Sequence, residues 1–366
     1  MKRTWISRSM RKDDLPNLEE FRRTIGNGDI YSHAEMADYY EWKYFTGAPE
    51  PAIARVGDDG GKIVGSLCAT IKRIAINGKI FPCGELGDGF VHPDYRKQGM
   101  FTVLGREVVA ELAEKGVNFV YGRPNHNSYP GLKRKFGFEE VFFLKTMRRI
   151  VNIDNIIKNK IGGGILYHLC RPLAWVLRST VYGIREQSDH PDITISEVSA
   201  FDKRVDRLSE KVSADYAVMV SRDAEYLNWR YVEKPADYRI FTATEGDILR
   251  GYVIVRCVEF EQGRRKFGYL IDMLTAKDDV EAITLLMGRA MQYFAGENVD
   301  FATTWVIKDL SEATSSYYGG LTRAGFKPAG EDLYFLVRTD PPELKKVVAE
   351  SRPTDWFFRM GDTDGI

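Results

Sequence analysis

The chain has 366 residues, of which 44% are hydrophobic and 12% aromatic, and its 52 basic and 52 acidic side chains cancel. This length exceeds what one hydrophobic core usually holds, so two domains are expected, and the apolar content argues against disorder. A charge balance of zero argues against nucleic-acid binding, which normally brings a basic excess.

The first segment, from about residue 4 to 148, reads as a mixed α/β unit. Strands are predicted over 52–56, 62–71 and 81–91, and Asn77-Gly78 between apolar runs predicts a hairpin. A helix over about 102–115 places Leu104, Val108 and Leu112 on one face and ends at Gly116.

The chain then repeats itself. The segment 37–44 (ADYYEWKY) returns 187 residues later as 224–231 (AEYLNWRY), and Gly137-Phe138 returns 188 residues later as Gly325-Phe326. Matches in the same order along the chain indicate two copies of one fold. The predicted organisation is a first domain at 1–148, a helical connector at 149–191, a second domain at 192–338 and a tail at 339–366.

The connector 149–191 predicts one or two amphipathic helices broken at residues 162–164, packed between the domains or docked on a membrane surface or a partner. We expect the proline-marked tail to be exposed, with folding back over a cleft as the alternative. The four cysteines lack zinc-ligand spacing, which predicts reduced thiols and no metal. Without a signal peptide or a long apolar run, a cytoplasmic protein with no integral membrane segment is expected.

The most informative stretch begins with an apolar strand, 86–91, which runs through His92-Pro93-Asp94-Tyr95 into a basic turn, Arg96-Lys97-Gln98-Gly99, before the helix. Strand, turn and helix in this order leave unpaired amides and the positive end of the helix dipole at one place. Such a turn is suited to bind phosphate.

Residues 85–138 resemble the core of the GNAT superfamily of acyl-CoA-dependent N-acyltransferases. The family turn, Gln/Arg-x-x-Gly-x-Gly/Ala, corresponds to residues 96–101 (RKQGMF), and Gly137-Phe138 is also similar to the family pattern. The resemblance implies two tandem GNAT-like α/β domains, each a mostly antiparallel mixed sheet flanked by helices. Phe101 departs from the pattern, and its ring is expected to turn inward.

The resemblance also implies acetyl-CoA as the cofactor, with its pyrophosphate on the turn and its pantetheine along the edge of the splayed strand. Asn125 and Ser128 follow the next strand, where family members contact the pantetheine arm, and capping of the following helix is an equal alternative for them. The implied cofactor-binding residues are Phe90, Val91, Arg96, Lys97, Gln98, Gly99, Met100, Phe101, Asn125 and Ser128.

The second copy reads Ala276-Lys277-Asp278-Asp279 where the first has its turn. With no glycine and two aspartates that would repel a pyrophosphate, this copy is predicted not to bind coenzyme A. One active site per chain is therefore expected, with the second copy shaping the acceptor pocket.

The predicted catalytic residues are Glu85, Asp88 and Tyr129. Glu85, the preferred base, and Asp88 face opposite sides of a regular strand unless a bulge intervenes, and either could be an ordinary strand carboxylate. The position of the family's usual acid, a tyrosine, holds Lys133, which leaves Tyr129 as the nearest phenol or as a packing aromatic.

The function expected from the resemblance is transfer of an acetyl group from acetyl-CoA to a primary amine of a small molecule, perhaps an amino sugar, by a monomer or homodimer without nucleic-acid partners. The alternatives are a protein or peptide lysine acetyltransferase, a non-catalytic acyl-CoA-binding regulator, and a peptidyl transferase using aminoacyl-tRNA.

Overall fold

The computed structural model describes residues 4–25, 33–46, 48–161, 164, 190–260 and 263–364. The order of helices and strands in the first half returns in the second, which confirms the predicted mixed α/β class. The first half contains β1 (Ile6–Ser9), η1 (Lys12–Asp14), α1 (Leu15–Thr24), α2 (His33–Tyr44), β2 (Ile53–Asp59), β3 (Lys62–Ile76), β4 (Lys79–Val91), η2 (Pro93–Tyr95), α3 (Met100–Glu114), β5 (Phe119–Gly122), α4 (Tyr129–Phe136) and β6 (Glu139–Ile150).

A short helix, α5 (Ile153–Ile161), follows β6. The second half contains β7 (Thr194–Val198), α7 (Arg204–Ser213), β8 (Val218–Val220), α8 (Ala224–Tyr231), β9 (Tyr238–Glu245), β10 (Ile248–Phe260), β11 (Arg265–Thr275), α9 (Val280–Gly296), β12 (Phe301–Ile307), α10 (Ser316–Arg323) and β13 (Lys327–Thr339). The final segment adds α11 (Pro342–Glu350), η3 (Pro353–Asp355), β14 (Trp356–Phe357) and η4 (Met360–Asp362).

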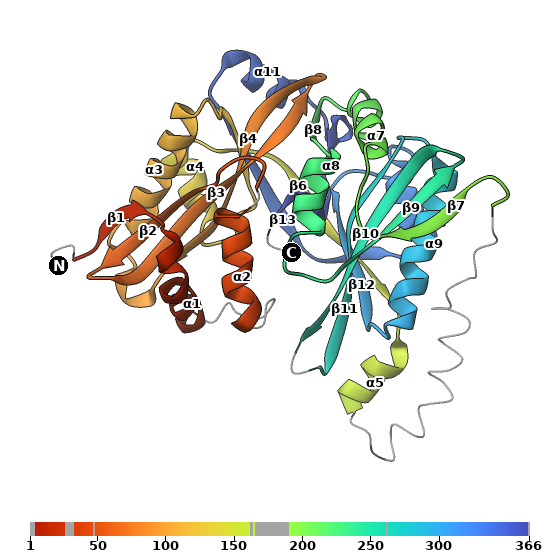
Figure 1. The fold of residues 1–366 in the computed structure, drawn as a ribbon, viewed down its shortest axis with the longest axis horizontal. Helices are drawn as coiled ribbons and strands as arrows, with labels where there is room; N and C mark the ends of the chain where they lie inside the picture. Colours follow the sequence, from red (N-terminus) through yellow and green to blue (C-terminus); the bar gives the residue numbers. More distant parts are fainter. Residues whose placement is uncertain are drawn as a thin grey trace.

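Within the described residues, fourteen strands form one continuous mixed sheet, with the main order β1-β2-β3-β4-β5-β13-β6-β12-β11-β10-β9-β7. The last strand of each half pairs in the other half: β13 lies between β5 and β6, and β6 pairs with β12. Strands of the two halves therefore meet in the middle of the molecule, as the crossing ribbons in Figure 1 show. The two copies share one sheet through this exchange.

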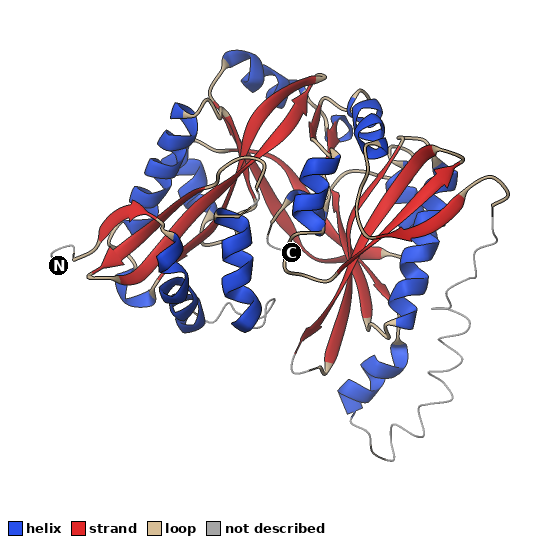
Figure 2. Cartoon of the chain, viewed as in Figure 1, coloured by secondary structure: helices blue, strands red, loops and turns tan. Residues whose placement is uncertain are grey.

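Helices cover both faces of this sheet, as Figure 2 shows. One core lies under α3 and α4 and includes Leu104, Val108 and Leu112, the three α3 residues that the sequence predicted. A second core lies under α9 and α10. A third core joins α1, α2, α7, α8 and the final segment, so the opposite face of the sheet is a single core common to both halves.

Local sequence explains two features that position the site. Asn77 and Gly78 both have positive φ, 48° and 77°, which is the backbone that a two-residue hairpin turn requires, and they join β3 to β4 as predicted. The apolar run of β3 buries both of its faces because helices cover the sheet on either side.

One expectation about the ends of the domains is wrong. The end of the tail is not exposed, although most of α11 is: Trp356, Phe357 and Phe358 belong to the shared core, and Asp362 and Asp364 are each 1% exposed. Most of the connector 149–191 lies outside the described residues, which contain only α5 as a helix there. No described helix combines the length and hydropathy needed to cross a bilayer.

Candidate active site and acyl-CoA groove

The strand β4 separates from its neighbour halfway along its length. Its parallel pairing with β5 ends at Leu86–Gly122, whereas β4 itself continues to Val91. The backbone from Gly87 to Val91, which includes Phe90, thus has no β5 partner on that edge among the described residues. An extended ligand arm with amide groups could pair with such an edge.

A bulge lies in the same stretch. The register of β4 against β3 shifts between Ser66 and Cys68, and Asp88 has a φ of 49°, a left-handed conformation unusual for aspartate. The bulge breaks the alternation of the strand. As a result Glu85 and Asp88 are both partly buried next to lysines that enter from the shared core, rather than facing opposite sides.

The basic turn connects β4 to α3 with two residues in the left-handed region, Lys97 (φ 63°) and Gly99 (φ 82°). Gly99 is the N-cap of α3. Among the described residues no acceptor bonds the amides of Gly99, Met100 and Phe101, so these donors are available where the helix dipole is positive.

Side chains of the turn fold against its own backbone. The Arg96 guanidinium donates to the carbonyl of Val91 at 3.4 Å, and the Gln98 amide donates to the carbonyl of Asp94 at 3.3 Å. The side chain of Met100 is buried against Gly57 and Gly65 of β2 and β3. Backbone amides and the positive charge of the turn, rather than a closed cage of side chains, would therefore face an anion.

The ring of Phe101 turns inward, as expected from the sequence. It packs against Phe136 with ring centroids 5.5 Å apart, and it lies against Gly89 of β4 and Gly131 of α4. A β-carbon built on Gly131 would lie 2.8 Å from the ring, so these glycines make room for it. The aromatic side chain leaves the helix N-terminus uncovered.

A buried ionic cluster surrounds Glu85. Lys72, from the middle of β3, donates to the Glu85 carboxylate at 2.5 Å and forms an ion pair with Asp364 at 2.9 Å. The backbone amide of Asp364 donates to Glu85 at 3.1 Å, and the Tyr121 hydroxyl donates to the carbonyl of Asp362 at 2.6 Å. The final segment of the chain is thus one wall of the cluster.

The electrostatics of this cluster favour a proton acceptor at Glu85. Burial, together with the negative charge of Asp364, raises the pKa of Glu85 to about 7, although Lys72 opposes the rise. The pKa of Asp364 is lowered, because Lys72, Lys43 and Arg230 outweigh the cost of burial. A carboxylate that titrates near neutrality suits general-base chemistry.

Asp88 has the opposite character. Lys43 of α2 donates to its carboxylate at 2.7 Å, and the Tyr44 hydroxyl donates to the same oxygen. These partners, together with the charge of Arg22, hold the pKa of Asp88 below its ordinary value despite burial. Asp88 therefore stays ionised and tied to α2, which makes it a better positioning group than proton acceptor.

The remaining predicted residues lie around α4. The Tyr129 hydroxyl donates to Glu140 at 2.8 Å and accepts from Lys133 at 3.1 Å, and its ring packs on Tyr334 of β13. Its hydroxyl is thus engaged away from Glu85. The Asn125 side chain accepts from the amide of Ser128 at 3.1 Å, a local turn that precedes α4.

Sequence reasoning missed Lys72, Lys43 and the positions of Asp362 and Asp364 in the cluster. Two signals could have found them. Lys72 is a charge within the long apolar run of β3, and the tail carries Trp356-Phe357-Phe358, an aromatic run typical of a buried segment.

In the second copy, the carboxylate that corresponds to Glu85 and the helix N-terminus that corresponds to that of α3 already have partners within the chain. Asp272 of β11 lies 187 residues after Glu85 and is paired with Arg222 at 3.0 Å. Asp279 caps α9 by accepting from the amide of Ala282 at 3.0 Å and also pairs with Arg250. The carboxylate of Asp279 occupies the helix terminus that would otherwise meet a phosphate.

Comparison with known proteins agrees with this geometry. Residues 20–141 match the family model described as an acetyltransferase (GNAT) domain. The search of curated proteins finds no match. Among solved structures, Saccharomyces cerevisiae N-myristoyltransferase with bound myristoyl-CoA is similar, with a TM-score of 0.63 and 12% identity, over 92% of this chain and 83% of that one.

Two bacterial structures are also similar. A GCN5-related N-acetyltransferase from Anabaena variabilis gives a TM-score of 0.58 at 12% identity, over 92% of this chain and 72% of that one. A probable N-acyltransferase from Enterococcus faecalis gives 0.59 at 14% identity, over 92% and 73%. At these identities the likeness is one of fold, whereas the family model rests on the sequence of the first copy. Residues 20–141 therefore match a GNAT acetyltransferase domain in sequence, and the chain as a whole is similar in fold to these acyltransferases.

Proposed function

We propose that this protein transfers an acetyl group from acetyl-CoA to a primary amine of a small molecule, with one active site in the first copy. The observation that carries the proposal is the position of Glu85. It lies on β4 just before the unpaired edge, has a pKa raised to about 7, and precedes the turn whose amides are available at α3.

In the proposed mechanism the turn at 96–101 holds the pyrophosphate and the edge from Gly89 to Val91 pairs with the pantetheine arm. An amide of that edge would donate to the thioester carbonyl as negative charge develops on its oxygen. These residues orient the thioester toward the cluster around Glu85. The amine nitrogen attacks the thioester carbon, the C–N bond forms and the C–S bond breaks.

Glu85 would accept the proton that the attacking ammonium must lose, directly or through water. Lys72 and the Asp364 amide hold the carboxylate in place. The thiolate of coenzyme A is a fair leaving group, so the mechanism assigns no dedicated acid. The hydroxyl of Tyr129 is engaged with Glu140 and Lys133, so Tyr129 would line the groove for the pantetheine arm rather than transfer a proton.

The proposal is tested by measuring release of free thiol from acetyl-CoA with a panel of amino sugars, polyamines and lysine peptides. Butyryl-, octanoyl- and myristoyl-CoA tested in parallel define the acyl chain that is accepted. A saturable rise in melting temperature with acetyl-CoA, and thiol release with a small amine, are expected. Release only with peptides would assign the protein to lysine acetylation. Binding without release would assign it to acyl-CoA sensing.

A further inference from the structure

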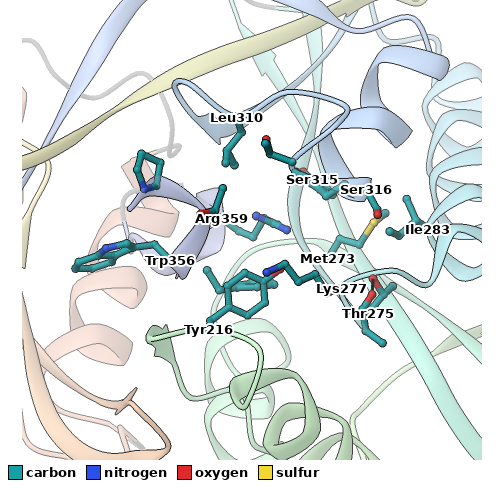
Figure 3. Close-up of a pocket in the computed structure, with 16 residues that line it drawn as sticks. Tyr216, Met273, Thr275, Lys277, Ile283, Leu310, Ser315, Ser316, Trp356 and Arg359 are labelled. Carbon is teal, nitrogen blue, oxygen red and sulfur yellow. Dashed lines mark hydrogen bonds between the residues drawn. The ribbon is translucent and has the colours of Figure 1, made fainter. Parts of the chain in front are cut away.

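A pocket in the second copy lies where the first copy has its groove. The end of β11, the turn before α9 and the start of α10 surround it, and the final segment closes it from the side (Figure 3). The residues at its mouth and walls include Tyr216, Met273, Lys277, Ser316, Tyr317 and Arg359. This site is separate from the cluster around Glu85.

Arg359 is the informative residue of the pocket. It is only 7% exposed, and its guanidinium lies 3.8 Å from the ring centroid of Tyr317 and 4.2 Å from that of Phe357. Figure 3 shows its side chain extending into the middle of the pocket. Two aromatic rings thus hold the cation in a fixed orientation.

Within the part of the chain that the structure describes, the guanidinium of Arg359 has no counterion. One of its Nη atoms donates to the carbonyl of Phe358 at 3.0 Å, while its buried Nε has no hydrogen-bond partner among the residues described. No carboxylate in the described part of the chain forms an ion pair with it. A buried, unpaired cation is costly unless something else neutralises it, so an anion is the expected partner.

Three further donors point to the same kind of ligand. Lys277 lies 5.2 Å from the ring centroid of Tyr216 and makes no ion pair among the described residues. The first turn of α10 supplies the amides of Ser316 and Tyr317, for which the described chain offers no acceptor. The rim also carries exposed Asp278, whose carboxylate accepts from the Ser316 hydroxyl at 3.5 Å, whereas the second aspartate of this turn, Asp279, is neutralised by Arg250 at 2.7 Å. Two cations and a helix N-terminus outweigh this one carboxylate.

We propose that this pocket binds the phosphate group of a small phosphate monoester, through Arg359, Lys277 and the N-terminus of α10. A planar guanidinium with free N–H groups, an ammonium and helix amides together match the several oxygens of a phosphate. The apolar walls, among them Met273 and Tyr216, would contact the ester group. This site does not depend on acyl-CoA binding in the first copy.

The test is isothermal titration calorimetry of the full chain with phenyl phosphate, with inorganic phosphate to separate the ester from the free anion. Phenol and benzoate are the neutral and carboxylate controls. Saturable binding of phenyl phosphate is expected at one site of the second copy. Lys277→Gln and Arg359→Gln are each expected to raise its Kd roughly tenfold or more.

The matched control is Lys97→Gln, which changes the turn of the first copy and is expected to leave the Kd of phenyl phosphate unchanged. Lys277 is half-buried, so Lys277→Gln alone decides the question if Arg359→Gln fails to fold. The proposal is overturned by any of four results: no saturable binding of phenyl phosphate, tighter binding of benzoate, an unchanged Kd in Lys277→Gln, or loss of binding in Lys97→Gln.

Discussion

Trp42 and Trp229, the same position in the two copies, stack directly on each other with ring centroids 4.7 Å apart and an interplanar angle of 19°. The indole N–H of Trp42 donates to the backbone carbonyl of Trp229 at 3.0 Å. The contact is not reciprocal, because the indole nitrogen of Trp229 is buried without a partner among the described residues. The sequence repeat thus meets itself at the junction of α2 and α8.

This asymmetry predicts unequal effects for two otherwise identical substitutions. Trp42→Phe removes a hydrogen bond and leaves a buried carbonyl, so it should cost about 1–3 kcal/mol more than Trp229→Phe in free energy of unfolding. Urea denaturation of both variants measures the difference. Equal losses would contradict the assigned hydrogen bond.

Glu85→Gln should lower kcat of the amine-acylation reaction by roughly 10²- to 10⁴-fold, because the amide cannot accept the proton. In the unsubstituted protein kcat/KM should rise with pH and level off above about 7, since Glu85 must be ionised to act as a base and its pKa is raised to about 7. The variant should lose this limb of the profile.

The control for Glu85 is Glu114→Gln, at the exposed end of α3, which should keep both the rate and the pH profile. A pH limb that persists in Glu85→Gln would assign the base to another group.

Lys72→Met tests the ion pairs that hold the final segment in place. Lys72 has 0% side-chain exposure and bonds both Glu85 and Asp364, so its removal leaves two buried carboxylates facing each other. The expected cost is about 3–5 kcal/mol of unfolding free energy. Because Lys72 lowers the pKa of Glu85, the pH limb of any residual activity should move to higher pH.

Lys62→Met, at the exposed start of the same strand, is the matched variant and should change neither property. Thermal unfolding and pH–rate profiles of the two proteins give the comparison. A limb that moves to lower pH in Lys72→Met would refute the role given to this lysine.

Gly99→Ala and Gly116→Ala separate backbone strain from cofactor binding. The two glycines flank α3, have φ of 82° and 76°, and have no atom within 4 Å of a built β-carbon. Each substitution should therefore cost about 1–2 kcal/mol of stability for the same conformational reason. Only Gly99→Ala should also weaken the binding of acetyl-CoA, and calorimetry measures this change in affinity. A similar loss of affinity in Gly116→Ala would remove the turn from the proposed site.

Sequence patterns predicted local structure well and long-range relations poorly. The hairpin at Asn77-Gly78 and the helix after Gly99 follow from residue types whose backbone preferences act over a few positions. The bulge at Asp88 entered the sequence analysis only as an alternative, because aspartate rarely adopts positive φ and long-range contacts with Lys43, Tyr44 and Ser66 hold it there.

The prediction of an exposed tail failed for a related reason. Proline and charge in 339–364 look like a solvated end, whereas Asp362 and Asp364 are held by Arg222, Lys72 and Arg230, which lie far away in the sequence. Pairing across such separations leaves no periodic pattern. The local signs of it were the charge inside an apolar strand and the aromatic run in the tail.

The exchange of β6 and β13 has a consequence for biosynthesis. The sheet of the first copy stays open between β5 and β6 until Lys327–Thr339, which follows nearly all of the second copy, has left the ribosome. The nascent chain therefore presents unpaired strand edges between the synthesis of β6 and that of β13, a state prone to aggregation. The first copy, although encoded first, is completed only when β13 of the second copy is made, so a chaperone that shields strand edges would act on the chain before that point.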